Sequence, residues 1–157
     1  MAILKIVNEA GKYHDNRALA TVIDYCRKPE KVENGYVGGI ACNPLQAVIE
    51  METLASLYNK NDGLRLRHMC LNFEPNELTE PFTAYVIGHQ AAMYYGYDYQ
   101  IFYGVHQDKE HIHIHFVMNT VSYRSGLKYQ GTKKDYYDYQ NHLRAILSEY
   151  GISLMVH

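Results

Sequence analysis

With 157 residues, of which 47% are hydrophobic and 20% charged, the chain has the size and composition of one globular domain, which excludes an intrinsically disordered protein. Its formal net charge of −2 lacks the basic balance usual in DNA-binding domains, although a bound cation and stacking aromatic rings supply affinity that a charge count omits. No apolar run reaches the roughly 20 residues of a membrane span and no signal-peptide pattern opens the chain, so the sequence predicts a cytoplasmic protein without membrane insertion.

The first half of the chain predicts strands alternating with helices. The apolar run at 3–7 is typical of a short strand, and apolar side chains recur at helical spacing over 17–28. Residues 36–42 contain two adjacent glycines, which predicts a weak or bulged strand. A second helix is expected over 45–59, and the alternating pattern of 64–73 predicts another strand.

The second half adds two helices around a hairpin. A helix is predicted over 79–95, followed by two strongly β-type runs, 98–106 and 111–120, which four polar residues join. A last helix over 133–150 precedes a short strand at 152–156. We therefore expect a single α+β domain spanning 1–157, with a mainly antiparallel central sheet of about five strands and helices packed on it.

Histidines alternate along the second hairpin strand. Because successive side chains of a strand point to opposite faces, His111, His113 and His115 share one face, while Ile112 and Ile114 share the other. Three adjacent imidazoles need polar partners, so their face is not expected to be ordinary apolar core.

The pairing of the two hairpin strands decides which other side chains join this face. If the turn occupies the four residues after His106, then His106 pairs with His111 and Gly104 faces His113. Gly104 would leave a gap beside His113 for an ion, which His106 could reach diagonally to complete a set with His113 and His115.

Three imidazoles with open positions are typical of a catalytic metal site, and they suit zinc, manganese, cobalt or nickel better than calcium. Asp108 is expected to accept a hydrogen bond from a ligand ring, and His111, at the turn, is expected either to support a ligand or to be exposed. The alternative is a solvated polar face, but four histidines and an aspartate within ten residues favour the metal site.

The hairpin resembles motif III of the relaxases, the mobilisation nucleases of conjugative and mobilisable elements, which belong to the HUH endonuclease superfamily. Their histidine–hydrophobic–histidine signature matches His113-Ile114-His115, and their upstream histidine and acidic neighbour match His106 and Asp108. Further segments resemble the family in family order: 18–31, which looks like motif I, 67–73, 125–129 and 133–135.

The resemblance implies a function. In motif I a tyrosine ends a short helix, and by that match Tyr25 is the nucleophile among the 16 tyrosines. A relaxase nicks single-stranded DNA at a transfer origin through a 5′-phosphotyrosine, with a divalent metal: manganese or magnesium, or else zinc, cobalt or nickel. The resemblance further implies plasmid mobilisation or conjugation, accessory mobilisation proteins and a monomer. Because family members commonly carry further domains, 1–157 is expected to be either a small stand-alone nuclease or the N-terminal part of a longer protein.

Three alternatives remain open at this stage. A rolling-circle replication initiator uses the same nicking step, but such proteins usually place the tyrosine helix after the histidine hairpin, whereas here Tyr25 comes before it. A non-catalytic metal- or DNA-binding module would not depend on Tyr25. A metal-dependent hydrolase of small molecules would not bind a single-stranded oligonucleotide.

Basic side chains outside the hairpin are candidates for gripping phosphates, namely Arg67, Lys128, Lys133 and Lys134. The tyrosine-rich segment 94–99 is either a base-stacking platform or ordinary packing, and packing is favoured because tyrosine suits strands. The remaining histidines show no ligand spacing and are left out of the predicted site: His14, His68, His89, His142 and His157.

Overall fold

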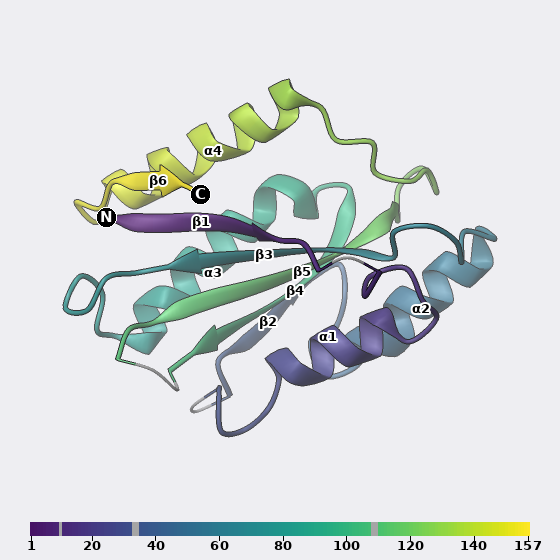
Figure 1. The fold of residues 1–157 in the computed structure, drawn as a ribbon, viewed down its shortest axis with the longest axis horizontal. Helices are drawn as coiled ribbons and strands as arrows, with labels where there is room; N and C mark the ends of the chain where they lie inside the picture. Colours follow the sequence, from purple (N-terminus) through teal and green to yellow (C-terminus); the bar gives the residue numbers. More distant parts are fainter. Residues whose placement is uncertain (10, 33–34, 108–109) are drawn as a thin grey trace.

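The computed structural model describes residues 1–9, 11–32, 35–107 and 110–157, which form a six-stranded sheet with helices on both faces (Figure 1). All neighbouring strands are antiparallel except the outer pair β1–β6, which is parallel. The predicted α+β domain is therefore confirmed, with six strands rather than about five. In order across the sheet the strands are β2 (Val37–Ile40), β4 (Tyr99–His106), β5 (His113–Ser122), β3 (Leu66–Asn72), β1 (Ala2–Val7) and β6 (Leu154–Val156).

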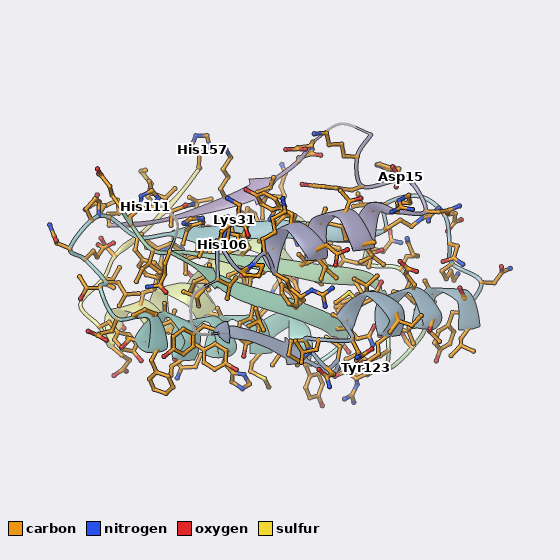
Figure 2. All side chains as sticks on the ribbon, turned by 90° about the horizontal axis from the view of Figure 1, so that it is seen from below. Asp15, Lys31, His106, His111, Tyr123 and His157 are labelled. Carbon is orange, nitrogen blue, oxygen red and sulfur yellow. The ribbon has the colours of Figure 1, made fainter. Side chains whose placement is uncertain are left out.

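The four helices are divided between the two faces of the sheet. One apolar cluster joins α1 and α2 to the sheet, and a larger one joins α3 and α4 to the opposite face (Figures 1 and 2). None of the helices among the described residues combines the length and the apolar character that a membrane span requires. The helices are α1 (Ala18–Cys26), α2 (Ala47–Leu57), α3 (Pro81–Gly96) and α4 (Lys133–Ser148).

Strand alternation decides which side chains meet α1. Along β3, Leu66 packs in the α1–α2 cluster, whereas Met69 and Leu71 pack in the α3–α4 cluster. Along β4 and β5, Phe102 and Val117 likewise belong to the α1–α2 cluster. Every second residue from these positions therefore faces α1, and in β4 and β5 those positions include the histidines of the hairpin.

The register of the hairpin differs from the predicted one by two residues. His106 pairs with His113, rather than with His111, and Gly104 pairs with His115, rather than with His113. The backbone carbonyl of Ile112, just before β5, accepts a hydrogen bond of 3.0 Å from Phe73 N, just after β3. A shift of two residues keeps every side chain on its face, so the predicted face of the histidines survives the wrong register.

Two glycines allow close approach to the sheet. A Cβ on Gly38 of β2 would lie 2.3 Å from the ring of Tyr103, so only glycine fits beside that buried ring. A Cβ on Gly104 of β4 would lie 3.2 Å from the carbonyl oxygen of Cys26. The gap predicted at Gly104 is thus filled by the end of α1, not left for an ion.

Candidate metal and nucleophile site

His106, His113 and His115 converge where β4 ends and β5 begins. His106 lies opposite His113 in the ladder, and His115 follows two residues later on the same face. Each offers a ring nitrogen, and the three nitrogens lie within 4.8 Å of one another. The centroids of the His106 and His115 rings are 4.2 Å apart, and that of His113 is 4.9 Å from His106 and 5.1 Å from His115. Such a group has the donor type and the spacing of a three-histidine metal site.

Burial keeps the His115 ring in the form that binds a cation. Burial, together with the neighbouring His106, lowers the pKa of His115 to about 2. At neutral pH the His115 imidazole is therefore uncharged and carries a lone pair, which is the form in which histidine ligates metals.

Hydrogen bonds orient the rings of His106 and His115. The Nε2 of His106 lies 3.1 Å from the carbonyl oxygen of Cys26, to which an N–H there donates. The Nδ1 of His115 lies 2.8 Å from the Nε2 of His68, and the Nδ1 of His68 lies 3.1 Å from the hydroxyl of Tyr13. A partner on one ring nitrogen fixes the tautomer and leaves the other nitrogen for a ligand bond.

His68 was left out of the predicted site, and the structure brings it into contact with His115. Its ring centroid lies 5.1 Å from that of His115, and burial lowers its pKa to about 4. Alternation along β3 places His68 on the same face as Leu66, but this local pattern does not say which side chains that face meets. The pairing of β3 with β5, which places His68 opposite Val117, could not be predicted from the sequence pattern.

Tyr25 lies on the last turn of α1, above the histidines. Its ring centroid is 6.2 Å from that of His106 and 6.4 Å from that of His115. The side chain is 43% exposed and reaches two clefts, of about 650 and 260 Å³, that His115 also lines. The ammonium groups of Lys28 and Lys31 lie 5.8 and 5.1 Å from its ring centroid, so positive charge is close to the phenol.

The loop that follows α1 is fastened to the hairpin. The backbone carbonyl of Lys31 accepts a hydrogen bond of 2.9 Å from Gln107 N, directly after β4. Figure 2 accordingly labels Lys31 and His106 close together. The nucleophile candidate, the basic loop and the first histidine are therefore parts of one packed unit.

Comparisons with known proteins identify the family. A family model described as "Relaxase: MobA/VirD2-like, nuclease domain" matches residues 24–152, which include Tyr25 and the three histidines. The chain belongs to this relaxase family. The description of the family model names a nuclease domain, and the match covers most of the chain.

Individual relatives agree with this assignment. Two proteins named "Protein rlx" from Staphylococcus aureus are each 27% identical to the chain, over 143 and 123 residues. The alignments cover 91% and 78% of the chain but 44% and 37% of those proteins, so the chain spans less than half of their length. A solved structure described as "Molecular Basis of Vancomycin Resistance Transfer in Staphylococcus aureus" matches 68% of the chain and 63% of its own, at 12% identity and a TM-score of 0.47, too weak a likeness to carry an argument.

The structure describes one of the two residues that were expected to support the metal ligands, His111. Asp108 lies outside the described residues, so its predicted role has no structural account. The ring of His111 lies 5.6 Å from that of His113 and lines the smaller of the two clefts at Tyr25.

Three of the four basic side chains expected to grip phosphates contact groups of the chain itself. Arg67 lies on the α3–α4 face, under the rings of tyrosines including Tyr95 and Tyr129. The ammonium group of Lys128 donates hydrogen bonds to backbone carbonyls near the start of β3. Lys133 is exposed at the start of α4, and Lys134 forms an ion pair with Asp138. In the tyrosine-rich segment 94–99, the side chain of Tyr95 is buried in the core, whereas that of Tyr97 is 62% exposed.

Proposed function

We propose that the chain cuts one strand of DNA by attack of Tyr25 on a phosphodiester, with a divalent cation held by His106, His113 and His115. One observation carries the proposal: an exposed tyrosine lies 6.2 to 6.4 Å, ring to ring, from two histidines of a three-imidazole cluster. Membership of the relaxase family supports the same activity.

The donor set fits a resident cation. Three imidazole nitrogens within 4.8 Å of one another leave the remaining coordination positions to water or to substrate oxygens. When bound, the cation neutralises charge on the non-bridging oxygens of the phosphate that is attacked. Manganese and magnesium are the ions we propose for turnover, because the resemblance to the relaxases implies them. Zinc, cobalt and nickel are the alternatives, because imidazole ligands suit these transition ions.

The chain's own residues supply the nucleophile and its setting. The phenolic oxygen of Tyr25 forms a bond to phosphorus, and the bond from phosphorus to the 3′ oxygen breaks. The proton that the phenol loses is balanced by one that the leaving 3′ oxygen takes, and the 5′ end remains as a phosphotyrosine. Lys28 and Lys31, both within 6 Å of the Tyr25 ring centroid, bring positive charge to the phosphate.

The substrate we propose is single-stranded DNA of a transfer origin, in mobilisation or conjugation, with the chain acting as a monomer alongside accessory mobilisation proteins. The clefts at Tyr25 are open to solvent and reach the histidines, which suits an extended strand. The acidic net charge of the chain is compatible with this substrate because the lysines near Tyr25 and the cation act locally.

The test is incubation of the purified chain with manganese and a labelled library of single-stranded DNA, followed by a denaturing gel and mass spectrometry. We expect a covalent DNA adduct on Tyr25 that His113→Ala abolishes. Tyr25→Phe should lose the adduct but keep DNA binding. Tyr58→Phe is the matched control, since Tyr58 is also 43% exposed, and it should form the adduct normally.

Four results would contradict the proposal. An adduct on another tyrosine would remove Tyr25 from the mechanism. No adduct with any divalent ion, although the ion binds and the fold is intact, would favour a non-catalytic binding module, and failure to bind single-stranded DNA at all would favour a small-molecule hydrolase. An adduct formed only at an origin of replication would favour a replication initiator.

A further inference from the structure

A second group of metal-ligating side chains lies beside the three histidines and shares one of them. The Sγ of Cys26 and ring nitrogens of His68 and His115 lie within 4.8 Å of one another. The three come from the end of α1, from β3 and from β5; Cys26 and His68 are buried, and His115 is half-buried. His68 and His115 also line the cleft of about 650 Å³ at Tyr25, which gives an ion a path from solvent.

The donor types of this group differ from those of the three-histidine set. A thiolate is a soft ligand that favours zinc, cadmium or cobalt over magnesium and manganese. Mixed cysteine and histidine donors are the ligands of many zinc sites. Tyr13 contacts the Nδ1 of His68 at 3.1 Å, so an N–H on that nitrogen can donate to the hydroxyl and leave Nε2 for an ion.

The shared histidine couples the two groups. A neutral imidazole has one lone pair, because its second nitrogen carries the proton, and therefore serves one ion at a time. An ion that takes His115 together with Cys26 and His68 leaves only His106 and His113 for the ion that supports nicking. The two groups are thus alternatives for one bound cation.

We propose that Cys26, His68 and His115 form a binding site for a thiophilic divalent cation such as zinc, and that its occupation switches the nuclease off. Binding releases the thiol proton of Cys26 to solvent, while each imidazole stays neutral and keeps its single N–H on the nitrogen that faces away from the ion. No oxidant or reductant takes part. The inhibitory consequence rests on the proposed function, whereas the binding of the ion does not.

The first experiment is titration of the reduced, metal-free chain with cobalt, followed by ultraviolet and visible absorption. We expect one ion per chain and a thiolate-to-cobalt charge-transfer band, because only ligation by sulfur produces such a band. The band should disappear in Cys26→Ala and weaken in His68→Gln. It should persist in His113→Ala, which disrupts only the three-histidine set. It should also persist in Cys42→Ser, because Cys42 follows β2 and its thiol donates to the carbonyl of Ile101.

Binding of cobalt without the band, or a band that survives Cys26→Ala in a folded chain, would overturn the proposal. The two variants Cys26→Ala and His68→Gln are used together because loss of the buried cysteine can impair folding. His68→Gln tests the site while it leaves Cys26 in place. These results are independent of DNA cleavage, so they can fail while the nuclease proposal stands, and the reverse also holds.

The second experiment measures formation of the DNA adduct at constant manganese while zinc is added. We expect zinc to inhibit, and the inhibiting concentration to rise at least about tenfold in Cys26→Ala, each variant being compared with its own zinc-free activity. An unchanged inhibiting concentration would overturn the switch.

Discussion

The hydrogen bond between His68 and His115 should contribute to metal affinity, and replacing His68 by leucine tests this directly. The two ring nitrogens lie 2.8 Å apart in a buried setting, so leucine leaves a ring nitrogen of His115 without its partner. Such a loss costs about 1–3 kcal/mol. If it falls on the metal-bound state, the affinity for manganese drops by about 10- to 100-fold, the usual range for side chains that orient metal ligands.

The assay is isothermal titration of manganese into the metal-free variant at neutral pH, after thermal denaturation has shown that it folds. His89→Leu is the matched control, because the Nδ1 of His89 lies 2.8 Å from the hydroxyl of Tyr103, far from the metal ligands on the other face of the sheet. His89→Leu should bind manganese normally, and His68→Gln, which keeps a hydrogen-bonding group, should recover part of the lost affinity. Manganese affinity within about twofold of the parent in His68→Leu, or an equal loss in His89→Leu, would refute the reasoning.

Three further predictions concern stability and DNA binding. Burial lowers the pKa of His68 from 6.5 to about 4, so the unfolded chain binds the proton first and the metal-free fold loses stability as pH falls from 6.5. Urea denaturation should show about 2 kcal/mol lost from this source by pH 5, and His68→Gln should not show that part of the loss. Gly38→Ala places a Cβ 2.3 Å from the ring of Tyr103 and should lower the free energy of unfolding by about 1–3 kcal/mol; an unchanged melting temperature would contradict the packing. Arg67→Leu removes a guanidinium 5.1 Å from the Tyr129 ring centroid and should cost about 1–3 kcal/mol of stability, with unchanged affinity for single-stranded DNA by fluorescence anisotropy; a weaker affinity would show that Arg67 contacts DNA.

Local patterns predicted the elements and the face of the histidines, and long-range pairing explains what they missed. Alternation along β5 is local, so His113 and His115 were assigned to one face correctly even though the register was wrong by two residues. His68 was missed because its contact with His115 joins two residues that lie 47 positions apart in the sequence, on β3 and β5. Nothing local distinguishes a strand residue that will meet a metal ligand from one that will meet solvent.

The predictions for the nucleophile and for the basic residues were limited in the same way, because local sequence does not show which side chains meet in the fold. Tyr25 was chosen by resemblance to motif I, because composition offers 16 equivalent tyrosines, and the structure now adds its ring contacts with the histidines. Arg67 looked available for phosphate because the sequence does not say which layer covers a strand face. In the fold that face lies under α3 and α4, and tyrosines surround the guanidinium.

The bond from His106 to the carbonyl of Cys26 has a consequence for how such a domain can diversify. It joins Cys26, the residue directly after the proposed nucleophile Tyr25, to His106, a proposed metal ligand, and the missing Cβ of Gly104 allows the approach. The distance between the end of α1 and His106 is therefore set by the contact of α1 with β4. We expect that the loops around the clefts can be exchanged between relatives. Such an exchange should change which DNA sequence is preferred and leave the proposed cleavage chemistry unchanged.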